Sequence, residues 1–190
     1  MQDAVAIRRE LAQTDPGRYR LNLATSLGVL AARFFEMGCL GDTPLVTEEA
    51  VAIYRELIQT DPGRYRPNLA TSLTFLGGSL AAMGRHTDAV HAEQEAVAIY
   101  RELIQSDHVR YRPDLAALLT LLGVSLSEMG RHSDALQAEQ EAVTIRRELA
   151  QANPGRHGRE LAQALTNLAD TLSELDRHSE AEQVRAEGNR

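Results

Sequence analysis

The sequence predicts an all-α fold, a solenoid of antiparallel helix pairs with about nine helices. The first observation is a stretch that recurs four times at a constant spacing of 46 residues, marked by Ala4, Ala50, Ala96 and Ala142. The second is a stripe of apolar residues at helical spacing, which also recurs four times. The third is a short turn after each stripe. A fixed period of about 20–50 residues is typical of solenoids, in which each unit packs only on its neighbours.

The chain begins with one copy of the repeated stretch, and its apolar positions predict a helix. Ala4, Ile7 and Leu11 are spaced by three and four residues, as on one face of a helix. Asp15-Pro16-Gly17 should end that helix, because Pro and Gly interrupt helices and favour turns. The same stretch reads EAVAIYRELIQTDPGRYR from Glu49, and close variants begin at Glu95 and Glu141.

A second type of helix follows each copy of this stretch. Its apolar positions repeat with a 4-3-4 spacing, in the sets Leu23, Leu27, Leu30, Phe34; Leu69, Leu73, Leu76, Leu80; Leu115, Leu119, Leu122, Leu126; and Leu161, Leu165, Leu168, Leu172. Pro67 and Pro113 precede two of these stripes. We expect them at the first helical position, where a Pro costs no hydrogen bond.

Short turns separate the second type of helix from the next copy of the first type. Gly84 and Gly130 are expected in the left-handed conformation that closes a helix. The polar residues predicted as N-caps of the following helices are Thr87, Ser133 and Ser179.

Two positions depart from the repeat. Pro44 aligns with a helix interior in the other copies, so that helix should begin later, with Thr43 as N-cap and Pro44 at the first position. The loop Asp107-His108-Val109 lacks the Pro and Gly of its counterparts. We still expect a turn there, but one that the local sequence favours less strongly.

Composition excludes several classes of function. The net charge is −7, which disfavours nucleic acid as the main partner because phosphate binding needs a clustered positive face. The single Cys39 forms no intrachain disulfide, and no apolar run reaches the ~18 residues of a membrane span. We therefore expect a soluble cytoplasmic protein without membrane association.

Residues that suggest chemistry have structural explanations. His86, His132 and His178 recur once per repeat and lack the i, i+4 spacing of helical metal ligands, so they should pack the turns. The RYR triplets beginning at Arg18, Arg64 and Arg110 resemble a stacking ridge for single strands. Their repetition in each unit favours Tyr packing between units, with each Arg near an Asp or Glu. No arrangement of catalytic residues is present, and no cofactor or metal site is predicted.

The chain resembles the tetratricopeptide repeat (TPR) family in a long-repeat form. The pairs Leu76-Gly77 and Leu122-Gly123 match the first helix of a family unit, and the residues that match the second helix are Ala89, Ala96, Ala135 and Ala142. We expect Gly77 and Gly123 at sites of close helix approach, with an Ala opposite. The resemblance implies a right-handed superhelix over 1–190, with a partial unit 1–20, units at about 21–66, 67–112 and 113–158, and a C-terminal capping unit 159–190.

In this family the first helices of the units line a concave groove that binds an extended peptide or a partner helix. By the resemblance, the groove residues here are Thr25, Phe35, Thr71, Thr74, Thr120, Val124, Glu128, Gln163, Thr166, Asp170, Ser173 and Glu174. The predicted function is a non-catalytic scaffold for an unidentified protein or peptide, with an apolar anchor near Phe35 and Arg or Lys near Asp170 and Glu174. The alternatives are a self-associating module, as a dimer or head-to-tail stack, and a regulatory fragment of a larger multidomain signalling protein.

Overall fold

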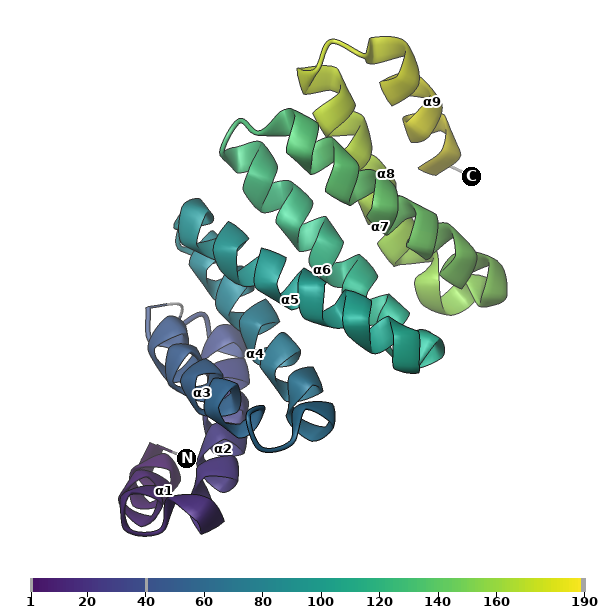
Figure 1. The fold of residues 1–190 in the computed structure, drawn as a ribbon. Coiled ribbons are helices and arrows are strands. Elements are labelled where there is room, and N and C mark those ends of the chain that lie inside the picture. The colour runs from purple at the N-terminus through teal and green to yellow at the C-terminus, as the bar shows by residue number, and fades with distance from the viewer. Residues whose placement is uncertain (1, 40, 189–190) are drawn as a thin grey trace. The chain divides into compact units, whose positions relative to one another are not determined.

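The computed structural model describes residues 2–39 and 41–188, without the side chains of residues 2, 35 and 36. Over this part of the chain it contains nine α-helices and no strand (Figure 1). The helices are α1 (Gln2–Thr14), α2 (Pro16–Glu36), α3 (Thr43–Leu57), α4 (Pro62–Ala82), α5 (His86–Ser106), α6 (His108–Glu128), α7 (His132–Ala152), α8 (Pro154–Glu174) and α9 (His178–Gly188). The predicted helical fold is confirmed.

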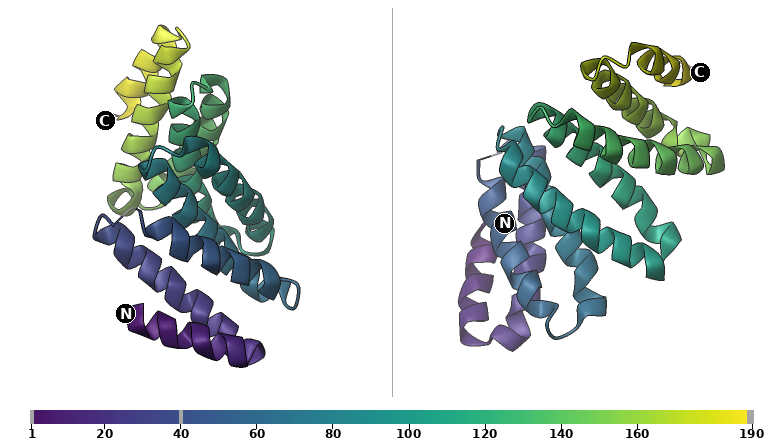
Figure 2. Two further views of the ribbon diagram at one scale, coloured as in Figure 1. Left: turned by 90° about the vertical axis from the view of Figure 1, so that its left-hand side faces the viewer. Right: turned by 45° about the horizontal axis from the view of Figure 1, so that its top comes forward.

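The chain divides into two compact units, residues 1–99 and residues 100–190, and the boundary falls within α5. In the first unit α1 packs on α2, α2 on α3 and α3 on α4. In the second unit α6 packs on α7, α7 on α8 and α8 on α9. Consecutive helices within each unit are antiparallel, as the two views of Figure 2 show. Each unit is therefore a stack of helix pairs.

The leucine stripes form the core of each unit. In α4, Leu69 and Leu73 are 2% and 1% exposed, and in α6, Leu119 is 1% exposed. In the second unit the stripe of α8 packs with Leu136 and Val143 of α7 and with Ala181 of α9. The helical spacing of these leucines is thus explained by one apolar face for each first helix.

A polar residue caps the first helices of the repeats. The side chains of Asp61, Asp107 and Asn153 each accept a hydrogen bond from the backbone N–H three residues later, at 3.1, 3.0 and 3.2 Å. Their backbone angles agree closely, with φ between −148° and −150° and ψ of 85° or 86°. The loop at Asp107 therefore keeps the common geometry without Pro or Gly, because the cap supplies the acceptor that the exposed helix end needs.

The position of this cap corrects the prediction for Pro67 and Pro113. The helices begin directly after Asp61 and Asp107, so both prolines lie inside α4 and α6 instead of at the first helical position. Each Pro lacks the N–H that would bond the carbonyl four residues earlier, which costs helix stability. Burial of the leucine stripe that follows offsets this local cost.

Replacing Asp107 with Ala should destabilise the protein by about 1 kcal/mol, the usual effect of losing an N-cap acceptor. The matched variant Asp61→Ala should lose less, because Pro62 still fixes the first residue of α4 in a helical conformation. Urea unfolding followed by circular dichroism measures both. Equal stability of Asp107→Ala and the parent would show that the cap does not encode this turn.

The second helices α5, α7 and α9 begin two residues earlier than predicted. α5, α7 and α9 start at their histidines, so Thr87, Ser133 and Ser179 lie inside the first turn and are not N-caps. At α7 the cap position is Arg131, which makes no side-chain cap hydrogen bond and instead donates from Nε to Asp134 at 2.8 Å. The same Arg–acid pair spans the first turn of α5 and α9.

Gly84 and Gly130 have φ of 74° and 71°, which confirms the predicted left-handed helix ends. The start of α3 differs from the prediction by one residue. Asp42 occupies the cap position, Thr43 is the first helical residue, and Pro44 is the second. The Thr43 hydroxyl is buried and donates to the carbonyl of Cys39 at 3.0 Å. It therefore ties the altered turn to the start of α3.

Candidate functional site

Two glycines on first helices face buried glutamates on second helices. A Cβ added to Gly77 would lie 2.5 Å from Cγ of Glu93, and one added to Gly123 would lie 2.5 Å from Cγ of Glu139. Real Cβ contacts essentially never reach this distance, so the predicted close approach is confirmed. The prediction of an Ala opposite each glycine was wrong, because the facing side chain is a Glu in both cases.

The repeats provide their own comparison at these positions. One repeat earlier the equivalent pair is Ala31 and Thr47, and one repeat later it is Ala169 and Arg185. Glycine thus occurs only in the two repeats that place a Glu on the facing helix. Glu93 is 0% exposed and Glu139 is 3% exposed. The missing Cβ leaves room for the carboxyl-bearing side chain to be buried between the helices.

Glu139 on α7 is the centre of a polar cluster. Burial raises its pKa to about 7, a hydrogen bond from Thr171 lowers that pKa, and the charge of Asp170 raises it. The hydroxyls of Thr171 and Ser127 are 3.0 Å apart. Oε2 of Glu139 is buried and has no hydrogen-bond partner among the described residues. A charge on a buried carboxyl oxygen without a hydrogen-bond partner costs free energy. This cost explains why Glu139 keeps its proton up to neutral pH.

A pocket of about 430 Å³ adjoins this cluster in the second unit. It is bounded by α6, α7 and α8, which lie side by side in Figure 1. Its lining residues are Val124, Ser127, Glu128, His132, Glu139, Asn167, Asp170, Thr171 and Glu174. The pocket brings together four predicted groove residues: Val124, Glu128, Asp170 and Glu174.

Sequence reasoning missed the α7 residues of this pocket. Glu139 and His132 are on a second helix, whereas the groove residues were chosen only from first helices. Thr171 was also missed, since it adjoins the predicted residue Asp170 but is buried. The signal in the sequence was the combination of Gly123 with Glu139, sixteen residues apart, which also occurs for Gly77 and Glu93.

Asp170 already has a partner within the chain. Nη2 of Arg185, on α9, is 3.0 Å from Oδ1 of Asp170 and also 3.1 Å from Oγ of Ser173. Glu128 and Glu174 are exposed at the same pocket. A ligand cation would therefore compete with Arg185 at Asp170, while Glu128 and Glu174 offer carboxylates at the rim.

The other predicted groove residues are distributed over both units. The hydroxyls of six of them donate to the carbonyl four residues earlier: Thr25, Thr71, Thr74, Thr120, Thr166 and Ser173. Thr25 lines a pocket of about 300 Å³ at α1 and α2. Gln163 and Thr166 line one of about 450 Å³ at α8 and α9. The side chain of Phe35 lies outside the described residues. Assignment of all twelve residues to one groove stays a prediction.

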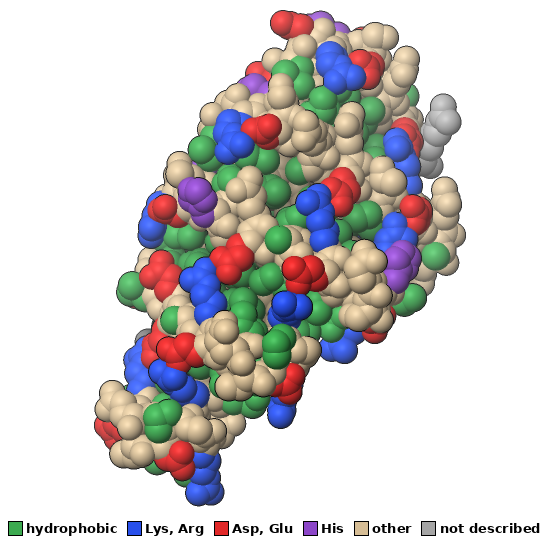
Figure 3. Space-filling view, in the orientation of Figure 1, with side chains coloured by type: hydrophobic (Ala, Val, Ile, Leu, Met, Phe, Trp, Pro, Cys, Tyr) green, Lys and Arg blue, Asp and Glu red, His purple; other side chains and the backbone are tan. Residues whose placement is uncertain are grey.

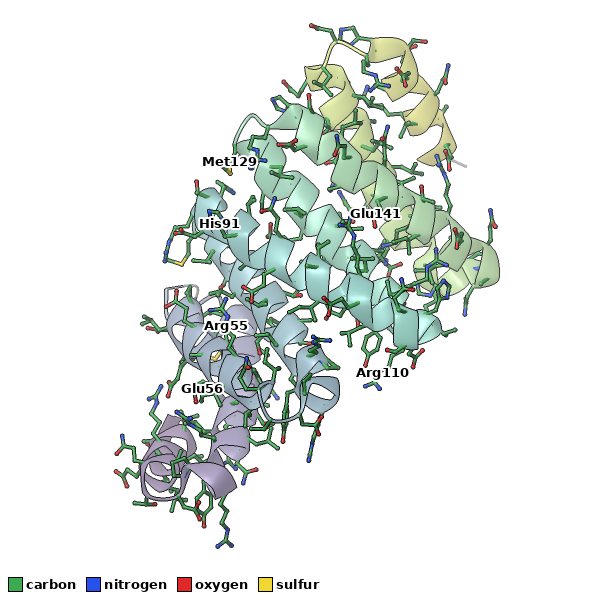
Figure 4. The ribbon with its side chains drawn as sticks, viewed as in Figure 1. Arg55, Glu56, His91, Arg110, Met129 and Glu141 are labelled. Atoms are coloured by element: carbon green, nitrogen blue, oxygen red, sulfur yellow. The ribbon has the colours of Figure 1, made fainter. Side chains whose placement is uncertain are left out.

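The second helices are connected by ion pairs that repeat with the unit. Each pair joins an Arg to a Glu 40 residues later: Arg9–Glu49, Arg55–Glu95, Arg101–Glu141 and Arg147–Glu187. Figure 3 shows blue and red side chains next to each other on this face, and Figure 4 labels Arg55 on α3 and Glu141 on α7. These pairs are partly exposed, so each contributes little to stability.

The RYR triplets are also engaged in packing. The guanidinium carbon of the first Arg lies 5.1 to 5.4 Å from the centroid of the adjacent Tyr ring, in the pairs Arg18–Tyr19, Arg64–Tyr65 and Arg110–Tyr111. The second Arg of two triplets pairs with an acid, in Arg20–Glu56 and Arg112–Glu148. These contacts support the packing interpretation of the triplets.

The described residues contain no group of three or more His, Cys, Asp or Glu that could hold a metal ion. His86 and His132 are partly buried at the starts of α5 and α7, whereas His178 at the start of α9 is exposed. Within the described part of the chain, no helix is long and apolar enough to cross a membrane.

Comparison with known proteins supports the resemblance. The sequence model of the tetratricopeptide repeat matches residues 69–110 and 115–154. These two matched segments are tetratricopeptide repeats, and the chain as a whole resembles that family. TPR proteins are generally non-catalytic scaffolds for protein interactions. No curated protein sequence matches the chain.

Solved structures of other proteins share the fold. The nearly identical TPR-like repeats of a proposed kinesin light chain from Podosopora anserina align with a TM-score of 0.68 and 21% identity, covering 99% of this chain and 85% of that one. A variant of the same repeats aligns with a TM-score of 0.69 and 21% identity, covering 99% of this chain and 84% of that one. The MamA protein aligns with a TM-score of 0.60 and 17% identity, covering 97% of this chain and 79% of that one. At these identities the comparison establishes the TPR fold alone.

Proposed function

We propose that this TPR protein is a non-catalytic scaffold that binds a peptide segment of a partner protein on the first helices. The observation that supports this function is the pocket bounded by α6, α7 and α8. Its volume of about 430 Å³ lies within the range of about 300–1,000 Å³ that ligand sites commonly have. Val124, 39% exposed, contributes apolar surface beside polar groups that can fix the orientation of a ligand.

Charge indicates the polarity of the segment. The pocket includes four acidic residues, Glu128, Glu139, Asp170 and Glu174, and the chain has a net charge of −7. A basic segment would be attracted at long range, which raises the association rate and fixes the direction of binding. The apolar anchor near Phe35 remains a prediction. The alternative function is self-association through α1, which also remains a prediction. The exposed apolar side chains of Ile7 (57%) and Leu11 (37%) favour this alternative.

The scaffold function is tested with a partner captured from the source cell and identified by mass spectrometry. Asp170→Arg should weaken binding by about tenfold and flatten its salt dependence, because an acidic contact becomes repulsive. Thr74→Arg, on α4, should block the groove by its bulk. Gln137→Arg is the matched control for Thr74→Arg, since each adds one positive charge and Gln137 is at an exposed position of α7, a second helix.

Titration calorimetry at two salt concentrations measures these effects. Parent-like binding by folded Asp170→Arg and Thr74→Arg would contradict a site on the first helices. Equal loss in Gln137→Arg would show a non-specific charge effect.

A further inference from the structure

The buried carboxyl of Glu139 has a feature that the scaffold function does not require. A Glu on the apolar side of a helix is rare unless it is paired, yet Oε2 of Glu139 has no hydrogen-bond partner among the described residues. The residue is only 3% exposed, and it lines the pocket between α6, α7 and α8. Gly123 makes room for it at the cost of a weaker helix position.

We propose that this pocket is a recognition site for a guanidinium group, with Glu139 as its buried acceptor and Glu128 and Glu174 as its rim, so that the partner segment presents an Arg side chain. The inference rests on the scaffold function and assigns the chemical class of its ligand. The acceptors come from three helices, and a guanidinium has five N–H donors in one plane that can reach several acceptors at once.

Competing ligands fit the pocket less well. A divalent metal ion needs three or more converging ligands, and the described residues offer no such group. An anion would meet four acidic side chains. A Lys ammonium is a compact, strongly hydrated charge, and burying it beside Glu139 would remove more hydration than burying a guanidinium does.

The site is specific to the third repeat. Glu93 occupies the same position one repeat earlier and faces Gly77 in the same way. The residues one repeat before Glu128, Asp170 and Glu174 are Ala82, Val124 and Glu128, so only one of the three is acidic. Glu93 is therefore a control for Glu139, because it shares the burial and the glycine contact but has only one acidic residue at the three equivalent positions in the sequence.

Recognition should be coupled to proton release. A cation favours the ionised form of Glu139, whose pKa is raised to about 7. The charged and titratable groups that face it are Glu128 from α6, His132 from α7, Asp170 and Glu174 from α8, and Arg185 of α9, which bonds Asp170. Binding should tighten up to about tenfold from pH 6 to pH 8, the range over which a group with that pKa ionises.

The test uses the whole chain and an acetylated, amidated pentapeptide with Arg between glycines, titrated to millimolar concentration and followed by NMR. The same peptide with citrulline is the neutral control of equal shape, and a Lys peptide tests the guanidinium assignment. The Arg peptide should bind at least about tenfold more tightly than the citrulline peptide, the effect expected for charge-assisted hydrogen bonds.

Two variants then locate the site. Glu139→Gln should weaken the Arg peptide about tenfold and remove the pH dependence, whereas Glu93→Gln should bind like the parent. If Glu139→Gln does not fold, the exposed variant Glu174→Gln should still weaken binding severalfold. Equal binding of Arg and citrulline peptides, equal binding of Arg and Lys peptides, or parent-like binding by both Glu139→Gln and Glu174→Gln would overturn the proposal. These outcomes concern the isolated protein and are independent of whether a captured partner responds to Thr74→Arg.

Discussion

Replacing Gly123 with Ala should destabilise the protein by about 1–3 kcal/mol, the usual cost of overpacking a well-packed core. The new Cβ would lie 2.5 Å from Cγ of Glu139, an atom close to the α7 backbone that cannot move away by a simple rotation of the carboxyl group. Equilibrium unfolding in urea measures the loss. Gly77→Ala should behave in the same way because it meets Glu93 at the same distance.

Two further variants make this result specific. Gly28 lies within α2 with no atom within 4 Å of its added Cβ, so Gly28→Ala should stabilise the protein by up to about 1 kcal/mol through helix propensity. The double variant Gly123→Ala/Glu139→Thr reproduces the pair Ala31 and Thr47 of an earlier repeat and should regain most of the lost stability. A loss that persists in the double variant would show that the contact with Glu139 is not its cause.

The stability of the protein should fall as pH rises from about 4.5 to about 7, through the ionisation of Glu139. Burial raises the pKa of this carboxyl to about 7 in the folded state, whereas the unfolded chain releases the proton near 4.5. Between these values the folded state binds more protons than the unfolded state, so raising the pH favours unfolding. The contribution of Glu139 to the free energy of unfolding changes by at most about 1.4 kcal/mol per pH unit. It is constant above the pKa of the folded state.

Glu139→Gln should remove this part of the pH dependence, as measured by urea unfolding at a series of pH values. Glu148→Gln is the contrasting control, because a hydrogen bond from Arg112 lowers the pKa of Glu148. The stability that Glu148 contributes is present above its unfolded pKa and is lost as pH falls, the opposite direction. Parallel curves for Glu139→Gln and the parent between pH 4.5 and 7 would contradict the assignment.

The repeat and the leucine stripes were enough to predict the fold. Both signals are periodic, and each is present in four copies along the chain, so chance patterns were excluded. Helix starts were harder to predict. Ser133 has the side chain of a typical N-cap, yet the helix begins at His132 and Arg131 pairs with Asp134 across its first turn. Pro67 was placed at a helix start because the cap at Asp61, six residues earlier, was not recognised.

The pocket could be predicted only in part. Asp170 and Glu174 follow from the helical register of α8, since their positions relative to the buried stripe are fixed by it. Glu139 was not singled out from the sequence, because a Glu is rarely buried and its burial depends on a tertiary contact with Gly123. A comparison of the repeats with one another contained this information, because the small residue is Gly where the facing residue is Glu and Ala where it is Thr or Arg.

The Arg–Glu pairs between second helices also bear on how such a chain can change in length. Each Arg meets a Glu 40 residues later, and both residues recur with the 46-residue period. Duplicating or deleting one whole repeat therefore leaves each Arg at the same distance from a Glu, and no other substitution is needed. An insertion of any other length between Arg101 and Glu141 would separate these partners and shift the stripe of α6 relative to α7. Gene duplication in steps of 46 codons is consequently the simplest route by which this surface is inherited intact.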